Sequence, residues 1–170
     1  MKRTVVVLLA AVIIIAVYMA GFASRPGDPD EPIGLGIHDD IRMVYQIKTD
    51  DRKQGVGAGL YYVNKLMKAY EKLGVDSGEV YAHAVLHGDA GYWLLKDSQY
   101  DRADETRSEN PNKSVVKQLL NRGVSVELCA STMRNNGWTQ QDVLEGIKIV
   151  AGAYPRIIDL QLRGHAYIRF

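Results

Sequence analysis

The chain has 170 residues, with 21 lysines and arginines, 20 aspartates and glutamates, and a single cysteine. This charge balance supplies no electrostatic footprint for nucleic acid, so we expect no nucleic-acid partner. One cysteine cannot form a disulfide within the chain, which leaves its thiol buried, reactive or bound to another molecule.

The first 23 residues are typical of an export signal or a membrane anchor. Lys2 and Arg3 precede an uncharged run from Thr4 to Ala20, and Gly21-Phe22-Ala23 favours cleavage before Ser24. The run is also nearly long enough to span a bilayer, which needs about 20 apolar residues, so a retained anchor is the alternative. In both cases we expect an exported protein, either periplasmic or anchored to the outer face of the inner membrane. Any membrane contact would then be made through this segment.

Residues 24–36 contain Pro26, Pro29 and Pro32 and predict a flexible linker. Residues 37–170 fit one domain of ordinary size, large enough to bury its own core. In chain order, this domain is expected to contain a strand over 41–47, a helix from Val56 to a cap at Gly74, a strand over 79–86, a short helix over 90–95, an exposed loop over 96–110, a helix over 112–122, a strand over 124–128, a helix start at Thr139, a strand over 147–150, a helix over 155–163 and a strand over 166–170.

Strands separated by helices of this length predict parallel βαβ units. We therefore expect an α/β fold in three layers, with helices on both faces of a mostly parallel five-stranded sheet. In such a sheet the carboxyl ends of the strands share one edge, where ligands gather. Asp50 and Asp51, His87 and Cys129 each follow a strand. The order of elements therefore predicts that these residues share one rim.

Cys129 is the principal candidate for chemistry at this rim. The residues after it lead into a helix, whose N–H groups and dipole favour a thiolate and lower its pKa. The alternative is that Cys129 packs in the core as a small hydrophobic residue.

His87 is a candidate acid/base group or hydrogen-bond partner, because histidine titrates near neutrality. Its alternative role is to bridge backbone groups at a turn. His83 lies four residues earlier on the same strand face, and with His87 and Cys129 it could form a soft metal site. No close-spaced ligand motif accompanies the three residues, so we assign no metal and no cofactor.

Three further groups of residues have structural interpretations. Asp50 and Asp51 point to opposite faces if they continue a strand, so we expect them to cap a turn or a helix. The glycines of Gly55–Gly59 lack the lysine and the spacing of a phosphate loop and predict close packing at a helix start. Trp93 and Trp138 are predicted to contribute to an oligomer surface.

Three motifs resemble the DsrE/DsrF-like family. They are His87-Gly88 followed by an apolar helix, Gly123-Val-Ser-Val-Glu-Leu-Cys129, and the ending Gly164-His-Ala-Tyr167-Ile168. The resemblance extends from Ile41 to Phe170 and is greatest to the intracellular-sulfur-oxidation group of that family. It implies a flavodoxin-like α/β fold and a homo-oligomer, commonly a trimer or hexamer.

The resemblance also implies a role for Cys129, since in sulfur-relay members a cysteine after the third strand carries a persulfide. We therefore expect an exported persulfide carrier, with a sulfur donor or acceptor protein as its partner. One departure is the export segment, because the relay proteins work in the cytoplasm. The alternative is an exported, non-catalytic module that binds a small ligand, a metal or a partner in the same crevice.

Overall fold

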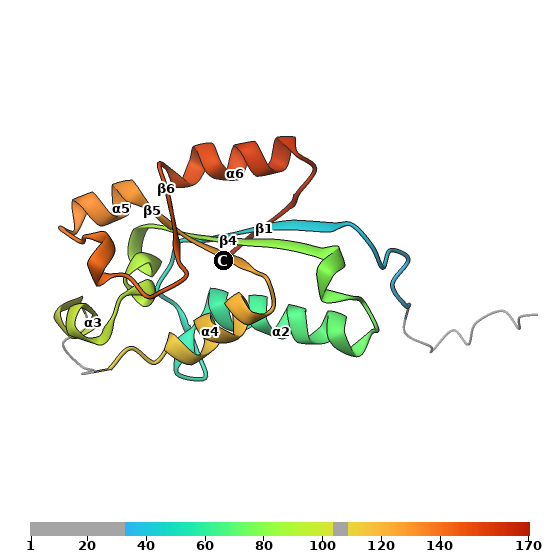
Figure 1. Ribbon diagram of the computed structural model, residues 1–170, viewed down its shortest axis with the longest axis horizontal. Helices are drawn as coiled ribbons and strands as arrows, with labels where there is room; N and C mark the ends of the chain where they lie inside the picture. Colours follow the sequence, from blue (N-terminus) through green and yellow to red (C-terminus); the bar gives the residue numbers. More distant parts are fainter. Residues whose placement is uncertain (1–32, 104–108) are drawn as a thin grey trace, which may run out of the picture. The chain divides into compact units, whose positions relative to one another are not determined.

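Five parallel strands form the central sheet in the order β6-β5-β4-β1-β7 (Figure 1). Every strand pairing within it is parallel. The strands are β1 (Ile41–Ile47), β4 (Val80–Leu86), β5 (Ser125–Cys129), β6 (Lys148–Val150) and β7 (Ala166–Arg169). The predicted α/β fold with five strands is confirmed, and the sheet is parallel throughout.

This computed structural model describes residues 33–103 and 109–170, and Leu35–Phe170 form one unit. The predicted signal or anchor, together with most of the predicted linker, lies outside the described residues. Among the residues described, no helix is both long and apolar enough to cross a membrane.

Helices cover both faces of the sheet. The elements outside the sheet are the helices α2 (Ala58–Lys72), α3 (Asp97–Ala103), α4 (Lys113–Asn121), α5 (Ala130–Asn135) and α6 (Ala153–Leu162), the short strands β2 (Arg52–Lys53) and β3 (Val56–Gly57), and the 3-10 segments η1 (Ser77–Glu79), η2 (Gly88–Leu94) and η3 (Gln140–Asp142). The helices α2 and α4 lie on one face, and α6 lies on the other (Figure 1). The predicted three layers are therefore present.

The two faces of the sheet differ in the size of their apolar cores. A large apolar core lies on the α2 and α4 side, where β1 contributes Met43, Tyr45 and Ile47. A smaller core lies under α6 and includes Val44 and Cys129. Because strands buried on both faces have no solvent side, β1 is a nearly continuous apolar run.

The glycines around the start of α2 allow close packing, as predicted. A Cβ on Gly57 would lie 2.2 Å from the indole of Trp93, and one on Gly59 would lie 2.6 Å from Ile47. The helix begins later than predicted, because β2 and β3 form a hairpin through Gln54 and Gly55, both at positive φ.

The predicted loop over 96–110 is partly wrong, since α3 forms within it. Tyr100 of this helix is fully buried. The buried Asn110 side chain donates to the carbonyls of Trp93 and Leu95, and its backbone N–H donates to the Asp97 carboxylate. One buried aromatic residue and these hydrogen bonds stabilise a segment whose composition is mostly polar.

Four smaller predictions also need correction. Trp93 is fully buried and belongs to the core, so it contributes nothing to a surface. Asp50 and Asp51 cap no helix and lie in the loop between β1 and β2. Thr139 caps only the short 3-10 segment η3, through a capping box. The last helix starts at Ala153, two residues before the predicted proline.

Candidate functional site

The carboxyl ends of β1, β4 and β5 bring Lys48, His87 and Cys129 to one pocket of about 620 Å³. Leu86 pairs with Leu128 in the parallel ladder, so the next residues, His87 and Cys129, leave neighbouring strands at the same edge. The structure therefore brings together His87 and Cys129, two of the four residues that the strand order placed at this rim. Lys48 adds a positive charge that the sequence did not single out.

Cys129 has an exposed fraction of 5% and is the N-cap residue of α5. Burial acts to raise the pKa of its thiol. The nearby backbone N–H groups of Thr132, Ala153 and Ser131, together with the Thr132 hydroxyl, outweigh burial and lower the pKa. A thiol surrounded by donors in this way favours its thiolate form.

Thr132 is the residue that the sequence interpretation missed. Its Oγ1 accepts a hydrogen bond of 3.1 Å from the backbone N–H of Gly88, which leaves the hydroxyl hydrogen free to donate to the sulfur. Thr132 is buried, and its methyl group lies against Gly91, whose added Cβ would come within 2.7 Å of it. Its position three residues after Cys129 was the available signal, because the third residue of a helix offers its N–H to the N-cap.

His87 is buried, and burial is the first cause that lowers its pKa, followed by the charges of Lys48 and Arg169. The imidazole is therefore neutral at neutral pH. Its Nε2 lies 2.8 Å from Nε2 of Gln46, and its ring contacts Tyr154 edge-on at 5.3 Å between centroids. These contacts favour the predicted role of hydrogen-bond partner over that of a charged acid.

His83 does not join Cys129, contrary to the metal-site alternative. Its Nδ1 lies 2.7 Å from Oε1 of Glu127, a carboxylate with an exposed fraction of zero. Arg156 of α6 donates to both oxygens of Glu127, at 2.8 and 3.0 Å, and the Ser125 hydroxyl donates at 2.9 Å. In the part of the chain that the structure describes, no three metal-ligating side chains form a group.

The ion pair between Glu127 and Arg156 holds α6 over the Cys129 pocket. Burial acts to raise the pKa of Glu127, but hydrogen bonds from His83, Arg156 and Ser125 lower it to about 2. The carboxylate is thus ionised and holds the start of α6 at the sheet. Ala153, at that start, supplies one of the N–H groups that reach the Cys129 sulfur.

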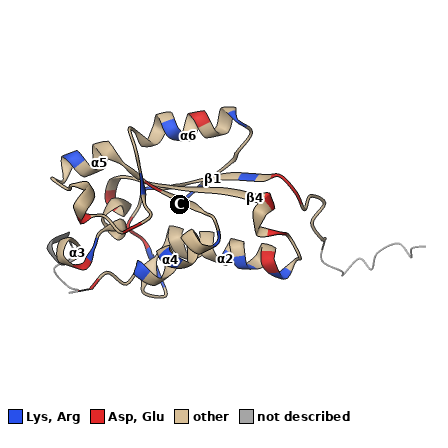
Figure 2. Cartoon of the chain, in the orientation of Figure 1, with Lys and Arg blue, Asp and Glu red and all other residues tan. Residues whose placement is uncertain are grey.

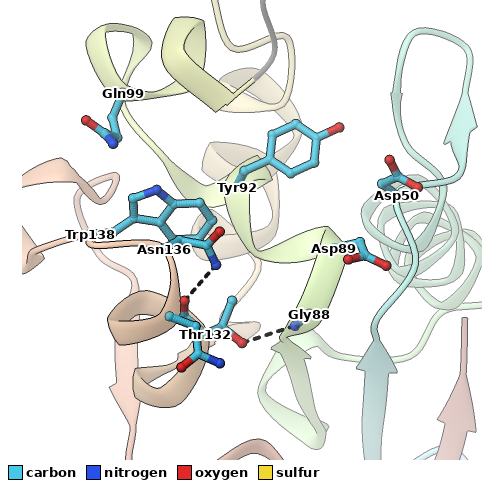
Figure 3. A pocket seen from close by; sticks show the side chains of 9 residues that line it. Asp50, Gly88, Asp89, Tyr92, Gln99, Thr132, Asn136 and Trp138 are labelled. Atoms are coloured by element: carbon cyan, nitrogen blue, oxygen red, sulfur yellow. Dashed lines mark hydrogen bonds between the residues drawn. The ribbon is translucent and has the colours of Figure 1, made fainter.

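A second pocket of about 520 Å³ adjoins the first, and the two share Gly88, Thr132 and Asn135. Figure 3 shows Asp50 and Asp89 on one side of it and the indole of Trp138 on the other, with Tyr92 between them. Other lining residues are the amides of Gln99, Asn135 and Asn136. This pocket places Asp50 near the rim as predicted, whereas Asp51 accepts a hydrogen bond from Thr49 instead.

Comparisons with known proteins are consistent with this architecture. The sequence model of the DsrE/DsrF-like family matches residues 59–170. The chain resembles MTH1491, a protein of unknown function from Methanobacterium thermoautotrophicum, with 26% identity and a TM-score of 0.56, over 77% of this chain and 100% of that one. It also resembles the ychN protein from E. coli, with 14% identity and a TM-score of 0.56, over 76% and 100% of the two chains, which indicates a shared fold. No curated protein matches the chain.

Proposed function

The chain belongs to the DsrE/DsrF-like family, and on that basis we propose that it is an exported sulfur carrier that holds a persulfide on Cys129. The family suggests a function related to sulfur relay. The observation that supports the finer proposal is the set of backbone and hydroxyl donors around a thiol of lowered pKa. Such donors stabilise a negative charge on sulfur, which both the thiolate and the persulfide carry.

The proposed transfer needs no oxidant. The Cys129 thiolate attacks the terminal sulfur of a donor persulfide, the donor's S–S bond breaks, and the donor leaves as a thiolate. An acceptor thiolate then attacks the terminal sulfur on Cys129, which leaves as a thiolate in turn. A lowered pKa helps in both steps, because it raises the thiolate fraction and makes Cys129 a better leaving group.

Intact-mass analysis of the protein purified from its native compartment tests this proposal. We expect one added sulfur atom on the wild-type protein, lost on reduction and absent from Cys129→Ser. The same spectrum reports whether the chain is cleaved after Ala23. If the wild-type protein takes up no sulfur from a persulfide donor, or if Cys129 reacts with alkylating reagents only after unfolding, the carrier proposal fails.

The alternative function is an exported, non-catalytic module that binds a small ligand or a partner. The second pocket favours it, because two carboxylates, three amides and two aromatic rings line a cavity that does not include the thiol. Binding of a small ligand that is unchanged in Cys129→Ser would support this alternative over the carrier.

Export and self-association are parts of the same proposal. The basic start and uncharged run of residues 1–23 support export to the periplasm or to the outer face of the inner membrane. A reporter fused after Phe170 that is active only in the cytoplasm would contradict it. Exposed apolar side chains on α6 support a homo-oligomer, and a sulfur donor or acceptor protein is the further partner that a carrier requires.

A further inference from the structure

A chain of three polar side chains runs from the edge strand of the sheet to the Cys129 pocket. The hydroxyl of Tyr167 on β7 donates to Oε1 of Gln46 on β1. The other end of the same amide, Nε2, lies 2.8 Å from Nε2 of His87. Gln46 is 5% exposed and His87 is 6% exposed, so both ends of the second contact are shielded from water.

The direction of these hydrogen bonds follows from the chemistry of the groups. An amide has one acceptor oxygen and one donor nitrogen, and Tyr167 takes the oxygen. The amide nitrogen that faces His87 can therefore only donate. A neutral imidazole has one acceptor nitrogen, so Nε2 is the acceptor and the ring proton resides on Nδ1.

We infer that Gln46 and Tyr167 are positioning residues that hold His87 in its Nδ1–H tautomer and so leave a neutral hydrogen-bond donor for the pocket that His87 shares with Cys129. Among the residues that the structure describes, Nδ1 of His87 forms no hydrogen bond, whereas Nε2 faces Gln46. His87 and Cys129 line the same pocket and follow the paired residues Leu86 and Leu128. With Nε2 turned to Gln46, Nδ1 is the ring nitrogen left for the pocket.

The inference deepens the proposed function and rests on it. A neutral Nδ1–H donor stabilises a thiolate or persulfide anion without supplying the proton that would quench it. Burial and the charges of Lys48 and Arg169 lower the pKa of His87, so the ring stays neutral in the same pocket. The inference also assigns a role to Tyr167. This residue belongs to the C-terminal motif at residues 164–168 and takes no direct part in the proposed sulfur transfer.

Nitrogen-15 NMR of the full chain distinguishes the two tautomers, with the His87 signals assigned by their loss in His87→Asn. At pH 7 we expect a protonated-type shift for Nδ1 and an unprotonated-type shift for Nε2 in the wild-type protein. Gln46→Glu replaces the donor with an acceptor, so Nε2 becomes protonated. Tyr167→Phe frees the amide to turn, which lowers the Nδ1–H population. The control Tyr81→Phe, at an exposed tyrosine of β4, leaves the tautomer unchanged.

The response of His87 to the charge on the sulfur has its own readout. The Nδ1–H proton of His87 should move downfield as Cys129 ionises, and this movement should disappear in Cys129→Ser. Three outcomes would overturn the inference. They are a proton on Nε2 of His87 in the wild-type protein, an unchanged tautomer in Tyr167→Phe, and an Nδ1–H signal that does not shift when Cys129 ionises. These signals require no sulfur transfer. If the protein shows these NMR signals but takes up no sulfur, the proposed function is refuted. If it takes up sulfur but lacks these signals, only the inference about His87 is refuted.

Discussion

At the scale of single residues, the reactivity of Cys129 depends on what touches its sulfur. The thiol is nearly buried, and burial alone would make it inert by raising its pKa. Backbone N–H groups from both α5 and α6 reverse that effect, together with the hydroxyl of Thr132. Groups from two helices, α5 and α6, thus act on one sulfur atom, and the Thr132 hydroxyl is the contact that a substitution can remove.

Thr132→Val keeps the shape of the side chain and removes its hydroxyl. We expect the midpoint of alkylation rate against pH to lie below the ordinary cysteine value in the wild-type protein and to rise in the variant. A hydrogen bond to a charged group contributes about 1.5–3 kcal/mol, partly offset by greater intrinsic nucleophilicity, so alkylation at pH 6 should slow by about threefold to tenfold. The control Thr49→Val removes a hydroxyl that bonds Asp51, away from the sulfur. Equal midpoints in the wild-type protein and Thr132→Val would refute this role.

At the scale of elements, two close contacts determine how helices meet the sheet. One is the ion pair between Glu127 of β5 and Arg156 of α6, which joins the sheet to the helix above it. The other is the approach of the β3–α2 junction to Trp93 at Gly57, where a Cβ has no room. The basic and acidic residues along α6 (Figure 2) include further pairs of Arg156 and Arg163 with Asp159, which are more exposed and contribute less.

Glu127→Gln leaves Arg156 without its buried partner and should lower the free energy of unfolding by about 3 kcal/mol at pH 7, measured with urea. The folded state holds the pKa of Glu127 near 2, below its ordinary 4.5. The ionised carboxylate therefore stabilises the fold fully above pH 4.5, and that stability is lost as pH falls through about 2. Glu127→Gln has no ionisable group at this position and should lack this pH-dependent stability. The difference in free energy of unfolding between the wild-type protein and the variant should therefore become smaller toward pH 2.

The exposed Asp159→Asn is the control for this experiment, and it should cost less than about 1 kcal/mol. A difference between wild-type protein and Glu127→Gln that stays constant from pH 7 to pH 2 would contradict the assigned pKa.

Gly57→Ala places a methyl group where the indole of Trp93 lies and should destabilise the fold by about 2 kcal/mol or more, measured by thermal unfolding. Gly36→Ala is the matched control, because a Cβ there meets nothing within 4 Å. If both variants unfold at the wild-type temperature, the packing of η2 against the hairpin is looser than the structure indicates.

At the scale of the whole molecule, α6 presents an apolar stripe on its outer side. Tyr154, Ile158 and Leu162 recur every four residues and are 57%, 56% and 84% exposed. Tyr154 also lines the Cys129 pocket, so the stripe begins at the candidate site. An exposed apolar row of this kind on a helix is typical of a surface that another molecule covers.

We expect the native protein to self-associate through this stripe. Ile158→Glu should shift the protein toward monomer in sedimentation velocity at micromolar concentration, because a charge at a buried interface is costly. Leu73→Glu is the control, since Leu73 is 53% exposed at the end of α2 and outside the stripe. A monomeric wild-type protein would refute self-association, and equal effects of both variants would refute the choice of surface.

Local patterns in the sequence were sufficient to predict the architecture. The β-branched and aromatic residues of 41–47, the period of two in residues 124–128 and the helical spacing from Leu60 to Met67 reflect short-range geometry and predicted the α/β sheet. The strand order then placed His87 and Cys129 at one rim, because parallel strands end on the same side. The hairpin at Gln54-Gly55 and the helix from Asp97 were missed, since Gln54 is unusual at positive φ and a single buried tyrosine leaves no periodic signal.

Contacts between segments far apart in the chain decided the chemistry of the site. The alternation of β5 indicated one apolar face but did not show that Glu127, on the other face, meets Arg156 under α6. Likewise, the donors on the Cys129 sulfur come from α5 and from the start of α6, and the partner of His87 comes from β1. Burial and hydrogen bonding depend on which elements pack together. The sequence therefore predicted the location of Cys129 and a lowered pKa from the helix that follows it, whereas only the folded structure revealed the donors from the start of α6 and from the Thr132 hydroxyl.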